Sequence, residues 1–313
     1  MQPHPYVERS FALLGVRSGW IMNRFIVVIF LFASSPICLA GSPPSTINAP
    51  FVETYKKSGK ELIYVAVVHH SSLKYPNAMT DPTFKTIAQI FAQTPPDAVI
   101  VEGVDPPDLS RFLQFARSCA AANYNLPEKL CNEPAFAADL ATGIGAVVYG
   151  GEPPGASVLA YFEKQGYVAQ DVLAYYIMRM IPVQNNHAPL RPETFAAFEQ
   201  KVAKDAQRKL GISVPFSPDV FSAWYAKNVP GPANYLTITA NDTGPGSHGQ
   251  KPTLLNTLTG IDLVMRDESV VTTIQQALEK HNRVLVVYGA SHLVFEWNQL
   301  EQIMGTPTWS KPF

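Results

Sequence analysis

The chain has little charge, and the charge is not gathered in a block of one sign. Its 313 residues include 24 Lys or Arg and 25 Asp or Glu, so the formal net charge is −1 and charged residues make up 16%. A protein that binds nucleic acid through phosphates presents a basic patch or stripe. We therefore expect no nucleic-acid partner.

The chain also lacks an apolar run as long as the roughly 20 residues that cross a bilayer as a helix. The run Phe25–Ala33 is short, follows Met22-Asn23-Arg24 and precedes Cys38-Leu39-Ala40. A basic start, a short apolar core and a small-residue end are typical of a signal peptide. We predict a signal peptide over residues 1–40, with Met22 as the more natural start. The mature protein would be periplasmic or secreted, without a membrane span; the alternative is an anchor that stays.

Cysteine is scarce, with three in the chain. Cys38 would leave with the signal peptide, so that Cys119 and Cys131 remain. No third or fourth ligand lies near them in the sequence to complete a zinc knuckle. In an exported protein an even pair favours a disulfide. The alternative is two independent buried thiols.

Apolar runs rich in β-branched residues predict the central strands. Glu61–His69 and Ala98–Glu102 flank a helix that begins after Asp81, a good N-cap followed by a proline, and together they predict a parallel βαβ unit. Val284–Tyr288 is a third buried strand, and Arg266-Asp267-Glu268 is predicted to open the helix before it. The fold class is therefore α/β with a mainly parallel central sheet.

The rest of the chain is mostly helical in its patterning. Residues 41–60 are rich in Ser and Pro and then polar, which predicts a loose lead-in. Residues 61–313 are predicted to form a single α/β domain, with a large helical insertion at about 106–260. One short strand candidate, Ala146–Tyr149, interrupts that insertion.

Each apolar strand ends at a residue that can bind a metal or move a proton. The first strand leads into His69, the second into Glu102, and the third into Gly289 and then His292. Because the carboxyl ends of parallel strands share one edge of a sheet, we expect these side chains to converge there. Glu152, after the short strand candidate, would join them or act through a water.

Each of these residues also has a purely structural interpretation. His69 and His70 are adjacent and face opposite sides of an extended strand, so His70 is a packed or surface side chain in that interpretation. His292 is then a histidine at a helix start, bonded to a carbonyl. A carboxylate after an apolar strand is costly unless it is paired or metal-bound, which favours a function for Glu102. Among the other histidines, His187 and His248 are interpreted as solvated loop residues, and His281 lies on an exposed helix end.

Two histidines with one or two glutamates suit a divalent transition metal with open coordination positions. The predicted ligands are His69, His292 and Glu102, and the metal is Zn, Mn or Co. The spacing is not the local H-E-x-x-H pattern of zinc proteases, so the prediction depends on the convergence of strand ends.

These residues resemble the TraB/Tiki clan, which also includes GumN-like proteins, erythromycin esterase and the haem-binding protein ChaN. The resemblance lies in Val-Ala-Val-Val-His69, Val-Ile-Val-Glu102, Arg266-Asp267 and Val-Tyr-Gly289-Ala-Ser-His292-Leu. The mark of the clan is a pair of Gly-x-x-His motifs with a glutamate between them, and here Ala66 replaces the first glycine. The resemblance covers the first and last thirds of the mature chain.

The resemblance implies a fold like that of erythromycin esterase or ChaN and an exported metal-dependent hydrolase of a peptide or small-molecule substrate, which acts on a peptide or ester bond. The implied catalytic residues are Glu102, Glu152 and His292, and the residues implied to bind the cofactor are His70, Gly289 and Arg266. The alternative is a periplasmic protein of ChaN type that binds haem or another iron-linked ligand through one histidine. A third interpretation is a scaffold without catalytic activity.

Overall fold

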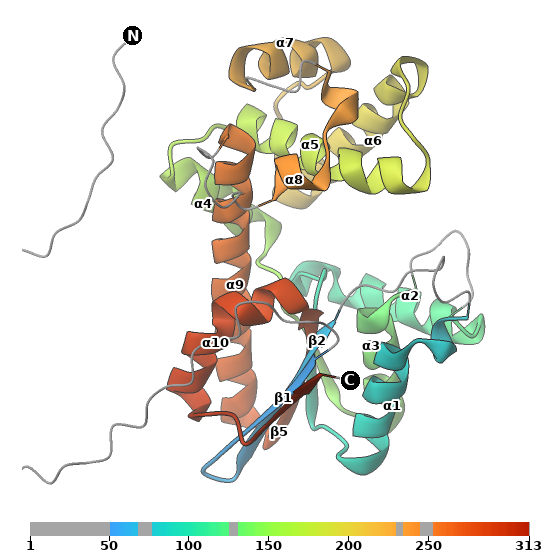
Figure 1. Ribbon diagram of the computed structural model, residues 1–313, viewed down its shortest axis with the longest axis vertical. Coiled ribbons are helices and arrows are strands. Elements are labelled where there is room, and N and C mark those ends of the chain that lie inside the picture. Colours follow the sequence, from blue (N-terminus) through green and yellow to red (C-terminus); the bar gives the residue numbers. More distant parts are fainter. Residues whose placement is uncertain (1–50, 68–76, 125–130, 230–233, 245–252, 313) are drawn as a thin grey trace, which may run out of the picture. The chain divides into compact units, whose positions relative to one another are not determined.

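The computed structural model describes residues 51–67, 77–124, 131–229, 234–244 and 253–312, and these residues contain a six-stranded mixed sheet (Figure 1). The strands are β1 (Phe51–Lys57), β2 (Lys60–Val67), β3 (Ala98–Val101), β4 (Val147–Gly150), β5 (Arg283–Gly289) and β6 (Trp309–Pro312). Their order is β4-β3-β5-β2-β1-β6. The first four in this order are parallel, and β1 and β6 are antiparallel to their neighbours. The expected α/β class with a mostly parallel sheet is confirmed.

The second half of the expected lead-in is an ordered strand. β1 pairs with β2 through a two-residue turn at Ser58 and Gly59, both of which have positive φ. Two such residues form the type of hairpin turn whose twist matches that of the strands. Val52 and Tyr55 of β1 are buried, so apolar side chains hold this segment on the sheet.

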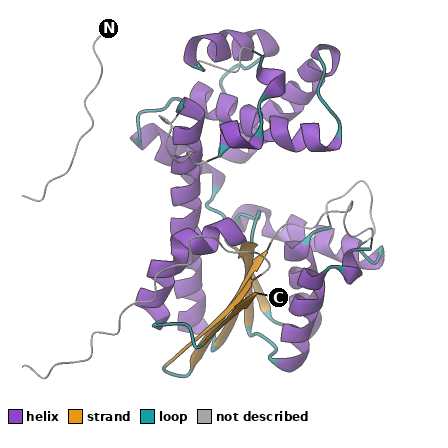
Figure 2. Ribbon diagram, in the orientation of Figure 1, coloured by secondary structure: helices purple, strands orange, loops and turns teal. Residues whose placement is uncertain are grey.

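Helices cover both faces of the sheet (Figure 2). On one face lie α1 (Pro82–Gln93), α2 (Leu109–Ala121) and α3 (Glu133–Ile144), and on the other lie α9 (Leu254–Lys280) and α10 (Ala290–Met304). Asp81 caps α1 by accepting a hydrogen bond from the amide of Thr83, as its position before a proline predicts. Short 3-10 turns lie at Ala78–Thr80, Pro106–Asp108 and Tyr235–Thr237.

The helices between β4 and α9 have a hydrophobic core of their own. They are α4 (Gly155–Lys164), α5 (Ala169–His187), α6 (Pro192–Leu210), α7 (Pro218–Asn228) and α8 (Ala240–Thr243). The 27-residue helix α9 joins this core to the sheet: Leu258 packs in the helical core, and Ile274 packs against the sheet. Within the described part of the chain, no helix is both long and apolar enough to span a membrane.

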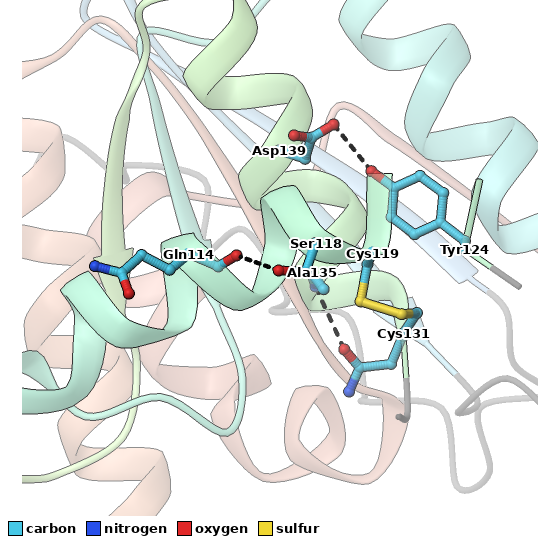
Figure 3. Close-up of a disulfide and its surroundings, with 8 residues drawn as sticks. Gln114, Ser118, Cys119, Tyr124, Cys131, Ala135 and Asp139 are labelled. Carbon is cyan, nitrogen blue, oxygen red and sulfur yellow. Dashed lines mark hydrogen bonds between the residues drawn. A yellow bond between two sulfur atoms is a disulfide. The ribbon is translucent and has the colours of Figure 1, made fainter. Parts of the chain in front are cut away.

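The predicted disulfide is present between Cys119 and Cys131, with their Cα atoms 5.6 Å apart (Figure 3). It ties the end of α2 to the residue before the Asn132 cap of α3, and both cysteines are buried. Close by, the hydroxyl of Tyr124 donates a hydrogen bond to Asp139 at 2.9 Å. The bridge therefore fastens two helices that cover the same face of the sheet.

Candidate functional site

Strand ends meet at one edge of the sheet, as the sequence predicts. Glu102 follows β3, Gly289 ends β5, and Val67 at the end of β2 pairs in register with Gly289. Because the strands are parallel, these three carboxyl ends lie side by side. His69 and His70 follow Val67 but lie outside the described residues.

Gly289 holds Glu102 in place. Its amide donates a hydrogen bond to Oε2 of Glu102 at 2.7 Å. A Cβ at position 289 would lie 3.1 Å from the same oxygen, which is tighter than ordinary van der Waals contact. Glycine is therefore needed here for close approach to a side chain, and its expected role in binding a cofactor stays a prediction.

His292 lies in the first turn of α10 and is buried. Its Nδ1 is 2.5 Å from Oδ1 of Asp267, and its Nε2 is 3.7 Å from Oε1 of Glu102. The ring of Tyr288 packs edge-on against the imidazole. The structural interpretation of His292, a bond to a carbonyl at a helix start, is thus wrong: its partner is a buried carboxylate.

Arg266 joins the two predicted glutamates. Its Nε and Nη2 donate to the two carboxylate oxygens of Glu152 at 2.7 and 2.6 Å, and Nη2 also donates to Oε1 of Glu102 at 2.9 Å. Two parallel hydrogen bonds of this kind are the strong geometry for arginine and a carboxylate. Arg266 therefore lies in the site, and what it binds directly is the pair of glutamates.

Glu152 is buried and held in its ionised form. Besides Arg266, its Oε1 accepts hydrogen bonds from the hydroxyl of Tyr288 and the amide of Gly103. Burial alone would raise the pKa of this carboxyl, but the charge of Arg266 and these hydrogen bonds outweigh it and lower the pKa to about 2. Glu152 is therefore a carboxylate at neutral pH and is not placed to donate a proton.

Two acidic residues of the site were not predicted as site residues. Asp267 was expected at the opening of a helix, but α9 begins at Leu254 and places Asp267 in its middle. The apolar residues Leu258, Ile261 and Met265 continue the helical spacing upstream and are the signal that was available for this. Glu296 lies one turn after His292 on α10, so the i, i+4 spacing could have indicated it.

Glu296 is fully buried beside Asp267 and His292. Burial and the nearby charge of Asp267 raise its pKa well above the ordinary value, while the hydroxyl of Tyr64 opposes this. Burial likewise raises the pKa of Asp267, against the hydrogen bond from His292. Burial therefore favours the neutral form of Glu296, which lies behind the histidine.

Two sets of side chains have donor atoms close enough for a divalent metal. Asp267, His292 and Glu296 each offer an atom within 4.8 Å of the others. However, the 2.5 Å contact between Asp267 and Nδ1 of His292 is a hydrogen bond, which leaves no room for an ion between those atoms. Asp267 thus has the orienting role that carboxylates have behind metal-binding histidines.

The second set consists of Nε2 of His292 and Oε1 of Glu102. Their separation of 3.7 Å is within the roughly 4 Å that two ligands at about 2.1 Å from one zinc can span. Arg266 already donates to the same oxygen of Glu102, so a metal here would share that carboxylate with the guanidinium. The donor atoms fit a divalent metal on this side of the imidazole.

The other histidines of the sequence lie apart from this group or are not described. His281 caps the end of α9, where its Nε2 is 3.0 Å from the hydroxyl of Tyr149. His187 is the last residue of α5, and its side chain is not described. His248 lies outside the described residues.

No family model, curated protein or solved structure matches this chain. The resemblance to the TraB/Tiki clan therefore stays a prediction from its motifs, and the geometry of the site carries the functional argument.

Proposed function

We propose that this protein is an exported hydrolase of peptide or ester bonds, in which His292 takes a proton from the attacking water. The observation that carries the proposal is the buried Asp267–His292 pair, with Nδ1 of the histidine 2.5 Å from the carboxylate. This pair resembles the base and its orienting acid in hydrolases that activate a nucleophile with histidine.

Asp267 determines which nitrogen of His292 is free to act as a base. The hydrogen bond at Nδ1 keeps a proton on that nitrogen, so the lone pair is at Nε2, on the side of Glu102. When His292 gains a proton, Asp267 stabilises the imidazolium. Glu102 lies 3.7 Å from Nε2, a separation at which one water can contact both groups.

Arg266 is placed to stabilise negative charge on the reacting carbonyl. Its Nε and Nη2 are bound to Glu152 and Glu102 and are fixed by them. Among the described residues, none accepts a hydrogen bond from its Nη1. A preorganised donor of this kind, supported by two carboxylates, is the usual means of stabilising an oxyanion.

A divalent metal (Zn, Mn or Co) is the alternative means of activating the water, because a lone pair at Nε2 that binds a metal cannot also take a proton; it would be held by His292 and Glu102, with His69 as the further predicted ligand. Such a metal would lower the pKa of a bound water toward about 7. Asp267, Arg266 and Glu152 keep the same orienting and charge-stabilising roles in its presence.

The test is hydrolysis of p-nitrophenyl esters and amino-acyl p-nitroanilides by the purified protein. His292→Ala is expected to lower the rate by about 10²- to 10⁴-fold, and Asp267→Asn to lower it as well, because the base is lost or misoriented. The matched control is His281→Ala, which removes a histidine outside the site. Equal rates for His292→Ala and the wild type would contradict the proposal.

Metal content and absorption decide the identity of the cofactor. If a metal activates the water, elemental analysis of the wild type should find Zn, Mn or Co, and His292→Ala should lose it. A Soret band that disappears in His292→Ala would instead support the haem-binding alternative. If protein without metal still hydrolyses esters through His292, the acid–base mechanism stands and the metal takes no part in it.

A further inference from the structure

A cavity of about 240 Å³ lies beside the candidate site. Two of the site residues, Glu152 and Arg266, form part of its wall, and helices of the insertion supply most of the rest. The polar side chains on that wall are Tyr176, Arg179, Lys209 and Asp262. The cavity is smaller than the roughly 300–1,000 Å³ of pockets that enclose a whole ligand, so it suits one group of a substrate.

Several hydrogen-bond donors on the wall of the cavity have no acceptor among the described residues. Arg179 donates through Nη1 to Asp262 at 2.8 Å. Within the described part of the chain, no residue accepts a hydrogen bond from its Nε or Nη2. The same holds for the ammonium group of Lys209 and the hydroxyl of Tyr176. Each of these donors needs water or a ligand as its partner.

The acceptors on the wall are largely occupied. Oε1 of Glu152 accepts three hydrogen bonds, and Oε2 accepts one from Arg266. Oδ2 of Asp262 accepts from both Arg179 and Tyr175. The charged side chains lining the cavity are three cations and two carboxylates, which leaves one cation in excess. A ligand that complements this wall brings oxygen acceptors and a negative charge.

One of the donors is also held in position. The guanidinium of Arg179 lies over the rings of Tyr175 and Tyr176, at 5.7 and 5.6 Å from their centroids. The backbone of Lys209, in the last turn of α6, packs closely against Gly155 of α4, while its side chain is exposed at the mouth of the cavity. Donors placed before a ligand arrives cost less to order on binding.

We propose that this cavity is a subsite for an anionic oxygen group of the substrate, a carboxylate or a phosphate, bound by Arg179, Lys209 and Tyr176. The scissile bond then lies at Arg266 and His292, and the anionic group lies at the far side of Arg266. This rests on the proposed function for the identity of the ligand as a substrate, but the binding of the anion does not require catalysis.

The experiment measures the binding of succinate, inorganic phosphate and neutral succinamide to the full protein by calorimetry. Succinate or phosphate should bind, and succinamide should bind at least about tenfold more weakly, because charged hydrogen bonds are lost. Lys209→Gln should weaken the binding of the anion by about threefold. Lys201→Gln, which removes an exposed charge from the same helix away from the cavity, is the matched control and should not change it.

Arg179→Gln alone leaves the buried Asp262 without its cation and endangers folding. The double variant Arg179→Gln/Asp262→Asn removes both charges, and it should weaken anion binding by about tenfold or more while the protein stays folded. Binding of phosphate but not succinate would identify the anionic group as a phosphate. Equal affinity for succinate and succinamide, or equal losses in Lys209→Gln and Lys201→Gln, would overturn the proposal.

His292→Ala separates this proposal from the proposed function. The variant should bind the anion as the wild type does, although it is expected to lack hydrolytic activity. If the wild type binds the anion but hydrolyses nothing, the subsite stands and the hydrolase proposal fails. If the wild type hydrolyses neutral esters through His292 but does not bind the anions, the hydrolase proposal stands and the subsite proposal fails.

Discussion

The two faces of the central sheet are built from alternate residues of the same strands, but they differ in chemistry. The face under α1, α2 and α3 is aliphatic, as Val65, Val101 and Val287 illustrate. The face under α9 and α10 includes Tyr64 and Tyr288, which lie beside the buried Glu296 and Glu152 respectively. Both faces are buried, so burial alone does not distinguish a structural face from a functional one.

The difference shows where a protein of this kind can place polar groups. The aliphatic face gains its stability from apolar burial and from the disulfide, and it tolerates no unpaired charge. The tyrosine face, under α9 and α10, keeps its apolar area in the rings, and the hydroxyls of Tyr55 and Tyr288 donate hydrogen bonds to Glu53 and Glu152. The candidate site lies at the end of this second face, where Arg266 and Tyr288 are the partners of the buried Glu152.

The largest loss of stability is expected when the cation of the tyrosine face is removed. Arg266→Met should lower the free energy of unfolding by about 3–5 kcal/mol, because Glu102 and Glu152 lose the guanidinium that offsets the cost of their burial. Urea denaturation at pH 7 measures this. The variant Arg266→Met/Glu102→Gln/Glu152→Gln should recover much of the loss. An unchanged midpoint for the single variant would contradict this account of the face.

The same ion pair predicts how the free energy of unfolding depends on pH. The pKa of Glu152 is lowered from the ordinary 4.5 to about 2 by Arg266 and its hydrogen bonds. The stability that it contributes is therefore fully present above about pH 5 and is lost as the pH falls toward 2. This acid-induced loss should be smaller in the triple variant than in the wild type.

Removal of the disulfide tests the aliphatic face. Cys119→Ser/Cys131→Ser should lower the free energy of unfolding by about 3 kcal/mol, as expected for a loop of this size in the chain-entropy model. Because the bridge lies with the helices on the face opposite α9 and α10, hydrolytic activity at a temperature where the variant is folded should stay unchanged. A large loss of activity in fully folded variant protein would show that the two faces are coupled.

The effect expected at Glu296 has no fixed size or sign, because both depend on pH. Burial raises the pKa of this carboxyl, so the folded protein holds the proton more tightly than the unfolded chain. Folding stability therefore decreases as the pH rises above about 4.5, by at most about 1.4 kcal/mol per pH unit. Glu296→Gln removes this dependence and should be more stable than the wild type at pH 8 but not at pH 4.

The control for this prediction is Glu279→Gln, which changes an exposed carboxylate on α9. Thermal unfolding from pH 4 to 8 compares the three proteins. If Glu279→Gln and Glu296→Gln have the same pH profile, the burial of Glu296 does not control stability on the tyrosine face.

Much of the sheet could be predicted because a buried parallel strand is a continuous apolar run, which can be recognised from the residues of that strand alone. β2, β3 and β5 and the shared edge that brings Glu102 to His292 follow from such runs. β1 was missed because the polar residues Glu53 and Lys56 interrupt its apolar pattern. Glu53 is nevertheless fully buried on the folded sheet. The true start of α9 was missed because an acidic pair at 267 and 268 resembles a helix start when its neighbours are not considered.

The sequence by itself determined the α/β class, the pairing of Cys119 with Cys131 and the strand end that presents Glu102. These depend on patterns within short segments, where burial and spacing are local properties. Only the tertiary structure decided that Asp267 orients His292 and that Arg266 holds Glu152, a residue 114 positions away. The physical reason is that the partner of a buried charge is chosen by packing in three dimensions, because the cost of desolvation is offset only where elements distant in the chain meet.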